Sequence, residues 1–163
     1  MINITIDKKL TNLLSEKNID VKDYIPAYNG ESAGLDLYNT SEDISVYPST
    51  LKSRDLNHKI LIPTGLRVII PKGYVGLIQE RGSVTKTNLK VRAGVIDCGY
   101  TGEIFVNCVN IGYSNTIIKS NEKLPFQLVV VKCDNTFNVI TENEYLELTE
   151  DSSRKDGSVG SSD

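Results

Sequence analysis

Short apolar runs broken by turn residues are the dominant pattern along this chain. The run "LRVII" is followed by "PKG" and then by "YVGLIQ", which predicts a β-hairpin. In "EIFVNCVN" the apolar residues alternate, with Ile104, Val106 and Cys108 on one face. "FQLVVVKC" is apolar and β-branched enough for a buried central strand, and "FNVI" predicts one more strand. The pattern therefore predicts an all-β barrel or sandwich of short strands.

Helical periodicity is confined to one stretch, "KKLTNLLSEKN". There Leu10, Leu13 and Leu14 share one face over two or three turns. We therefore expect at most one short helix. No internal repeat and no second domain is visible, so residues 1–149 are expected to form a single β domain.

The composition changes near Thr149. Segment 150–163, "EDSSRKDGSVGSSD", holds one apolar residue, Val159, among serines, glycines and charges. Such a segment cannot bury enough surface to stay ordered alone, so it is either a frayed terminus or a flap that orders over a ligand. Arg154 and the small residues from Gly157 to Ser162 suit a flap, because a guanidinium and accessible backbone NH groups bind phosphate.

Composition and charge narrow the functional classes. The 163 residues suit one domain, and the net charge of -3, with no basic stripe, argues against duplex nucleic acid as a partner. The N-terminus lacks the apolar core of a signal peptide, and no apolar run is long enough to span a bilayer. Three cysteines, none at CxxC spacing, indicate neither a disulfide framework nor a zinc site. We expect a reduced intracellular compartment, such as the cytoplasm, and no membrane partner.

The only histidine, His58, lies in the polar stretch "SRDLNHKI". A solvated loop histidine is the expected interpretation, and a mechanism built on several histidines is excluded. Candidate chemistry must therefore rest on other side chains.

One candidate is "QERGSVTK". Arg81 supplies a fixed cation, Gly82 lets the backbone approach, and Ser83 supplies a hydroxyl, so together they can cradle an oxyanion at a strand end. A simple turn explains the same three residues. The segment is not a Walker-type loop, which requires GxxxxGK[ST] before a helix.

Two carboxylates are the other candidates. In "GVIDCGYTG", Asp97 on a hairpin can orient and deprotonate a water, and Tyr100 can pack its ring against a sugar. An ordinary turn remains the alternative. In "ESAGLDLYN", Asp36 either faces solvent or faces a metal–water shell or a partner subunit.

Taken in order, these segments resemble the motifs of the trimeric dUTP pyrophosphatases (dUTPases). "IPAYNGESAGLDLYN" resembles the first motif, built on AGxDL, and "IPTGLRVIIPKGYVGLIQERGS" resembles the second and its approach. "AGVIDCGYTGEIFVNCVN" closely matches the third, GxIDxxYxG. Gln127 in "FQLVVV" matches the glutamine of the fourth, and "RKDGSVGSSD" resembles the fifth, RGxGGFGSTG. Five motifs in order over most of the chain make the resemblance specific.

The resemblance implies a compact, jelly-roll-like β fold, assembled as a homotrimer whose three active sites are each built from all three chains. It implies Mg²⁺-dependent hydrolysis of dUTP to dUMP and pyrophosphate, which lowers dUTP and supplies dUMP for dTMP synthesis. Asp97 would activate the water that attacks the α-phosphorus. Tyr100 would lie against the deoxyribose and leave no room for a 2′-hydroxyl.

The resemblance also implies the remaining site residues. The base would be read by the backbone of a hairpin whose tight fit excludes the thymine methyl, namely Val91, Gly94, Val95 and Ile96. The phosphates would be held by Arg81, Gly82, Ser83 and Gln127. Mg²⁺ would be bound mainly by the triphosphate and water, with Asp36 contributing through water at most. The tail would close over the nucleotide through Arg154, Val159, Gly160, Ser161 and Ser162.

Several positions depart from the family pattern. Gly82-Ser83 reverses the usual Ser-Gly of the second motif, so the hydroxyl contact is expected from a shifted position. Val159 replaces a phenylalanine that stacks on uracil, and Lys155 replaces a glycine, so flap closure is expected to be weaker. The lead-in to Gln127, "NEKLPF", lacks the usual Gly-Asp-Arg.

Two other functions are compatible with parts of this sequence. dCTP deaminases share the fold and much of the third motif, but they use a glutamate ten residues after the aspartate, where this chain has Asn107. An amide cannot shuttle a proton. The second alternative is a dUTPase-like regulatory protein that binds a partner and has weak catalysis. Retention of Asp97 and Tyr100 favours the enzyme.

Overall fold

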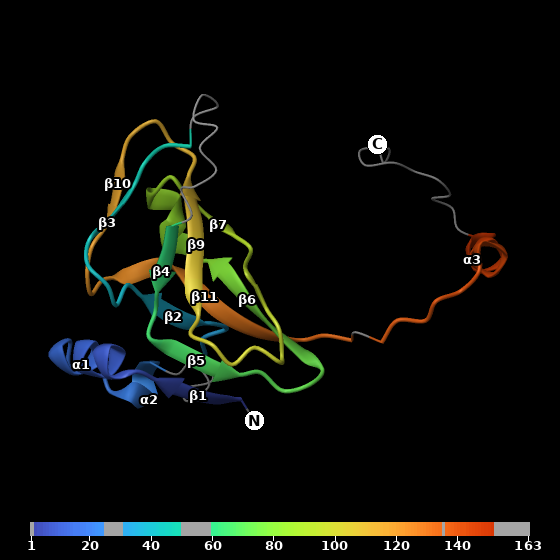
Figure 1. Ribbon diagram of the computed structural model, residues 1–163, viewed down its shortest axis with the longest axis horizontal. Coiled ribbons are helices and arrows are strands. Elements are labelled where there is room, and N and C mark those ends of the chain that lie inside the picture. The colour runs from blue at the N-terminus through green and yellow to red at the C-terminus, as the bar shows by residue number, and fades with distance from the viewer. Residues whose placement is uncertain (1, 25–30, 50–59, 135, 152–163) are drawn as a thin grey trace.

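Antiparallel strands are the main regular structure of the protein (Figure 1). The structure is a computed structural model that describes residues 2–24, 31–49, 60–134 and 136–151. The strands are β1 (Asn3–Ile6), β2 (Leu35–Tyr38), β3 (Ile44–Val46), β4 (Ile60–Pro63), β5 (Leu66–Ile69), β6 (Tyr74–Glu80), β7 (Leu89–Arg92), β8 (Val95–Ile96), β9 (Phe105–Asn110), β10 (Thr116–Ile118) and β11 (Lys123–Lys132). The helices are α1 (Lys8–Glu16), α2 (Val21–Tyr24), the 3-10 helix η2 (Gly82–Lys86) and α3 (Glu142–Thr149).

Four small antiparallel sheets are formed by these strands. Their strand orders are β2-β11-β6-β8, β4-β9-β7, β1-β5 and β10-β3. This arrangement confirms the prediction of an all-β fold of short strands and is consistent with a jelly-roll-like architecture. No described helix is long and apolar enough to cross a membrane.

The long strand β11 lies at the centre of the largest sheet. It pairs with β2 on one side and with β6 on the other. Leu124, Phe126 and Leu128 alternate into the core, so the intervening residues of the strand face away from it. The prediction of a central strand at "FQLVVVKC" is confirmed, but the strand is buried on one face only, and Val131 is exposed. Likewise, Ile104, Val106 and Cys108 are all buried on one face, as their spacing predicts.

Helix α1 covers one end of the sheets, as the periodicity of its leucines predicts (Figure 1). Leu10, Leu13 and Leu14 are buried, and the Asp7 side chain caps the helix by accepting from the Leu10 backbone N at 2.8 Å. The expectation of at most one short helix is wrong in detail, because α2 and α3 are also present. Helix α3 is set by a capping box between Thr141 and Glu144, a local signal independent of apolar periodicity.

Two strand predictions need correction. The runs "LRVII" and "YVGLIQ" both form strands, but they do not pair as a hairpin: β5 pairs with β1, while β6 pairs with β11 and β8. The turn between them therefore carries the chain from one sheet to another. "FNVI" is not a strand, because Phe137 and Val139 are 86% and 96% exposed and have no neighbouring strand in the described residues.

After β11 the described chain runs away from the sheets to α3, which stands apart from them (Figure 1). On α3, Tyr145, Leu146 and Leu148 are exposed rather than buried. We call residues 133–149 the C-terminal arm. Its apolar side chains find no cover within the described part of this chain.

Candidate active site

Asp36, Arg81 and Lys123 form a cluster of charges between three strands, which we call the Asp36 cluster. The Arg81 Nε lies 2.7 Å from one oxygen of the Asp36 carboxylate, and the Lys123 Nζ lies 2.7 Å from the other. The side chains of Arg81 and Asp36 are each 28% exposed. Partial burial makes these ion pairs stronger than pairs held fully in water. The backbone of Arg81 is also fixed, since its N donates to the Pro125 carbonyl at 2.9 Å.

Gln127 stands opposite Asp36 in the ladder between β11 and β2. Gly34 makes room for its side chain, because a Cβ at Gly34 would lie only 2.5 Å from the Gln127 Oε1. A polar cleft of about 250 Å³ joins these groups and is lined by Asp23, Tyr24, Ser32, Ala33, Gly34, Asp36, Arg81 and Gln127. The structure thus brings together three residues that the sequence placed far apart: Asp36, Arg81 and Gln127.

Tyr24 forms one wall of this polar cleft. Its hydroxyl is buried and makes no hydrogen bond within the described residues. Burial raises the pKa of Tyr24, and the nearby Tyr38 and Asp36 raise it further, so the phenol stays neutral. The two tyrosine rings pack at 5.7 Å between centroids, which fixes the wall.

Gly82 and Ser83 begin η2, directly after Arg81. Ser83 lines a second cleft of about 200 Å³, together with Thr87 and Lys123, rather than the polar cleft beside Asp36. Among the described residues nothing lies within 4 Å of a Cβ placed on Gly82, so none of them requires a glycine there. The reversed Gly82-Ser83 pair therefore places the hydroxyl away from Gln127, while Lys123 lies between the two clefts.

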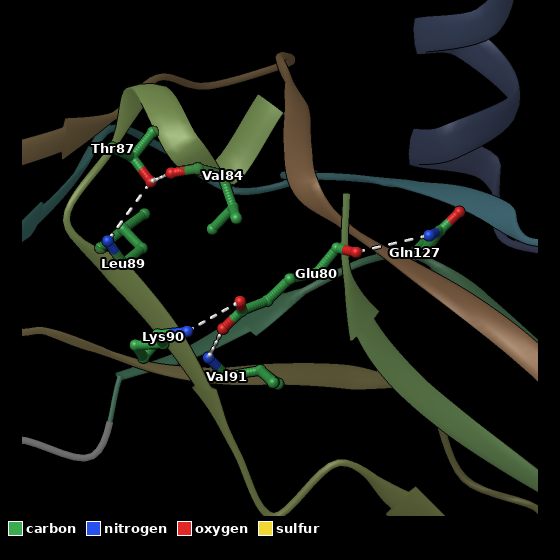
Figure 2. A network of polar contacts seen from close by, with 7 residues as sticks. All are labelled: Glu80, Val84, Thr87, Leu89, Lys90, Val91 and Gln127. Carbon is green, nitrogen blue, oxygen red and sulfur yellow. Dashed lines mark hydrogen bonds and ion pairs between the residues drawn. The ribbon is translucent and has the colours of Figure 1, made fainter. Parts of the chain in front are cut away.

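Glu80, the last residue of β6, connects this strand to the neighbouring sheet (Figure 2). Its carboxylate accepts from the Lys90 Nζ at 3.0 Å and from the Val91 backbone N at 3.4 Å. Its carbonyl accepts from the Gln127 Nε2 at 3.4 Å. One residue therefore links β6, β7 and β11. Sequence patterns gave no indication of this role, because a lone charged residue at a strand end is usually a solvated one.

The segment from Val91 to Ile96 is a corner between sheets and not the hairpin that the sequence predicts. β7 pairs with β9, whereas β8 pairs with β6. At the corner Ala93 adopts a φ of 49°, and the Gly94 carbonyl accepts from the Ile78 backbone N at 2.7 Å. A Cβ on Gly94 would lie 2.8 Å from the Ile78 carbonyl oxygen, so this close approach requires glycine.

Asp97 begins the turn that follows β8, which we call the Asp97 turn (residues 97–103). The Tyr100 N donates to the Asp97 carbonyl at 3.0 Å, and the Tyr100 hydroxyl donates to the Glu103 carbonyl at 2.7 Å. The tyrosine ring lies against Gly102, where a Cβ would be 2.6 Å from its hydroxyl oxygen. The Asp97 carboxylate is exposed and forms no ion pair within the described residues.

A third cleft, of about 300 Å³, is bordered by the Asp97 turn. It is lined by Leu61, Val95, Ile96, Asp97, Tyr100 and Phe105. Val95 is 62% exposed, and Leu61 and Phe105 are also exposed, so the walls are apolar surfaces left open in the single chain. The candidate residues therefore occupy three separate clefts. The tail candidates Arg154, Val159, Gly160, Ser161 and Ser162 lie outside the described residues.

Metal-binding side chains are sparse in this site. No group of three or more His, Cys, Asp or Glu side chains able to hold a metal ion occurs within the described residues. Each oxygen of Asp36 already accepts from a cation. A divalent ion bound here would thus take most of its ligands from a bound molecule and from water.

Comparison with known proteins gives one consistent family. The family model described as dUTPase matches residues 21–163. The deoxyuridine 5′-triphosphate nucleotidohydrolase of Mycolicibacterium gilvum is 34% identical over 140 residues, covering 83% of this chain and 84% of that protein. The Pol polyprotein of equine infectious anemia virus is 33% identical over 130 residues, covering 74% of this chain. The aligned part is only 10% of that polyprotein's length.

Solved structures agree with this family. The native dUTPase of equine infectious anemia virus has a TM-score of 0.62 and 28% identity, covering 88% of this chain and 98% of that one. A mutant dUTPase of Staphylococcus aureus phage phi11, which coordinates a structural Mg(II) ion, has a TM-score of 0.61 and 25% identity. That match covers 87% of this chain and 97% of the phage chain.

Proposed function

Because the chain belongs to the dUTPase family, we propose that it hydrolyses dUTP to dUMP and pyrophosphate. The observation that carries this proposal is the pairing of Asp97 and Tyr100 at one cleft, beside the backbone corner at Gly94. At the nucleoside end this reaction needs a carboxylate as general base, an aromatic ring that packs against the sugar, and a rigid backbone segment that hydrogen-bonds the base.

In the proposed reaction Asp97 accepts a proton from water as the water oxygen bonds to the α-phosphorus. The bond from that phosphorus to the bridging oxygen breaks, and pyrophosphate leaves with the electron pair. Tyr100 is suited to excluding a 2′-hydroxyl, because its ring is held from both ends by the hydrogen bonds of the Asp97 turn. The backbone of residues 91–96 is suited to reading uracil, since the corner at Gly94 is fixed to β6.

Arg81 and Gln127 would hold the triphosphate, supported by their joint position in the polar cleft. A guanidinium held through its Nε still presents its two Nη groups to phosphate. Ser83 would contribute from the adjacent cleft. Charge neutralisation and in-line positioning supply most of the catalysis in reactions of this kind.

Mg²⁺ is the proposed cofactor. The donor set supports an ion carried mainly by the triphosphate, since the described residues provide no three-ligand group and Asp36 is shared by two cations. The bound ion would neutralise phosphate charge. Asp36, Arg81 and Gln127 would orient the phosphate chain around it.

A homotrimer with shared sites is the proposed assembly. Two observations support it. The candidate residues fall in three clefts, and the walls of the Asp97 cleft are apolar surfaces open in the single chain. The C-terminal arm also leaves its own body with Tyr145, Leu146 and Leu148 exposed, which suits a segment that docks on a neighbouring copy. Residues 150–163 would follow it as the flap over the nucleotide.

Deamination of dCTP is an alternative activity, and an experiment should test for it. Asn107 lies in β9, opposite Leu61 and Arg92 in the two ladders of its sheet. An amide at this place offers no acid or base for deamination.

A reduced compartment remains our expectation for the chain, and its cysteines are free in the described residues, with Cys98 exposed.

The decisive experiment is pyrophosphate release from purified protein with dUTP and Mg²⁺, in parallel with UTP, dTTP and dCTP. We expect release from dUTP at least about tenfold faster than from any of the others, since loss or gain of one pocket contact changes rates by roughly 10–200-fold. Equal rates for dUTP and UTP would contradict the role of Tyr100. No release from dUTP would overturn the proposed function.

A further inference from the structure

A lysine outside the recognised phosphate-binding residues is built into the phosphate side of the site. Lys123 comes from the segment "NEKLPF", where this chain departs from its family pattern. Its Nζ lies 2.7 Å from the oxygen of Asp36 that Arg81 does not use. We propose that Lys123 is a positioning residue that fixes Arg81 through Asp36; this inference rests on the proposed role of Arg81 in holding the triphosphate.

The backbone explains how Lys123 reaches Asp36. In the ladder, Lys123 stands opposite Tyr38 and Gln127 stands opposite Asp36, so four steps along β11 match only two along β2. This bulge includes Pro125, which has no backbone N–H to donate to a ladder. The bulge shortens the reach between Lys123 and Asp36, and the Lys123 ammonium also lies 5.8 Å from the centre of the Tyr38 ring.

Two contacts are needed to fix Asp36 because a carboxylate held by one cation can rotate about its χ angles. Arg81 binds one oxygen of the carboxylate and Lys123 binds the other. With Asp36 held in this way, the Arg81 Nε has a fixed acceptor and its Nη groups keep one direction. Without Lys123, Asp36 can turn away and the guanidinium loses its anchor.

Charge balance supports the same role. One carboxylate between two cations leaves the Asp36 cluster with a net charge of +1 when all three are ionised, which suits an anionic ligand. Removing Lys123 leaves a neutral pair. The effect on a bound triphosphate is therefore expected mainly through the orientation of Arg81, and the lost unit of charge contributes the smaller part, because charges on partly exposed side chains are screened.

A double-mutant cycle separates action through Arg81 from direct contact with phosphate. The variants are K123M, R81A and the double variant, each compared by calorimetry for a non-hydrolysable dUTP analogue, for inorganic triphosphate and for deoxyuridine. K132M is the matched control, since Lys132 lies on the same strand, is exposed and has no ion pair within the described residues. D36N tests the intermediate link, because its amide is uncharged and has one acceptor oxygen, so it cannot hold both cations.

We expect K123M and D36N each to weaken the binding of the dUTP analogue and of inorganic triphosphate by about tenfold. This is the usual scale for the loss of one hydrogen bond to a charged group. Deoxyuridine binding and K132M should be unchanged. In the R81A background, K123M should weaken the binding of the analogue and of triphosphate by no more than about twofold further, because its effect on binding passes mainly through Arg81.

Full additivity of the losses in K123M and R81A would overturn the inference, since Lys123 would then act without Arg81. Triphosphate binding in K123M equal to that in K132M would overturn it as well. A different result would overturn the proposed function. If the wild-type protein binds inorganic triphosphate but neither hydrolyses dUTP nor prefers it over UTP, dTTP and dCTP, dUTP is not its substrate. The cycle with inorganic triphosphate would still decide the role of Lys123.

Discussion

The Asp36 cluster and the Asp97 turn are organised in opposite ways. The Asp36 cluster is complete within one chain: three strands converge, and ion pairs of 2.7 Å fix a half-buried arginine. The Asp97 turn fixes its own backbone and its tyrosine, but its carboxylate is exposed and its cleft has open apolar walls. From this difference we infer that the proposed phosphate-binding residues are held in place within the monomer, whereas the proposed reacting end depends on assembly.

Replacement of Asp97 by asparagine should have the largest effect on turnover. Loss of one general base costs about 10²–10⁴-fold in rate, while the Asp36 cluster lies in another cleft and is left intact. We therefore expect dUTP turnover to collapse and the affinity for a non-hydrolysable dUTP analogue to change less than threefold or so. Pyrophosphate-release assays give the turnover rate, and calorimetry on the same preparation gives the affinity for the analogue. Near-normal turnover would show that another group is the base.

Deletion of residues 152–163 tests whether the reacting end needs more than the described chain. No strand of the described structure lies beyond β11, so the fold should survive with an unchanged melting temperature. Turnover should fall by roughly tenfold to a hundredfold, because closing segments position substrates and exclude water. Thermal unfolding and steady-state kinetics check the two parts of this expectation. Full activity would assign the tail no part in closure.

Replacement of Tyr100 by alanine should relax the exclusion of UTP. The ring is held by the hydrogen bond to the Glu103 carbonyl, so its removal opens space beside the sugar. We expect the ratio of kcat/KM for dUTP over UTP to fall by about tenfold, the scale of one lost pocket contact. Replacement of Tyr113, which is fully exposed, is the control. A ratio that stays at the wild-type value would remove Tyr100 from sugar recognition.

The smallest effect is expected for Glu80, which lies between the two regions. In E80A the Val91 N loses its acceptor, and the corner near Gly94 loses a link to β6. The proposed uracil-binding backbone should then discriminate less well between uracil and cytosine. We expect the preference for dUTP over dCTP to fall by about threefold to tenfold, the range of one net hydrogen bond. Glu16, an exposed residue at the end of α1, provides the matched alanine control. Equal losses for both nucleotides would mean that Glu80 only stabilises the fold.

The sequence by itself determined four of the strands (β5, β6, β9 and β11), the main helix and the family. Apolar periodicity was enough for α1 and for the buried faces of β9 and β11, because side-chain burial follows directly from spacing. The order of motifs placed Asp97 and Tyr100 at one turn, since residues three apart in a tight turn cannot separate.

Only the tertiary structure decided which strands pair and which charges meet. Alternation within β5 and β6 does not say that each turns to a different partner, and the same holds for β7 and β8 at the Gly94 corner. Lys123 and Asp36 are 87 positions apart, and only the bulge at Pro125 brings them together. Pairing depends on the free energy of closing long loops over a shared core, and no local pattern in the sequence records that quantity.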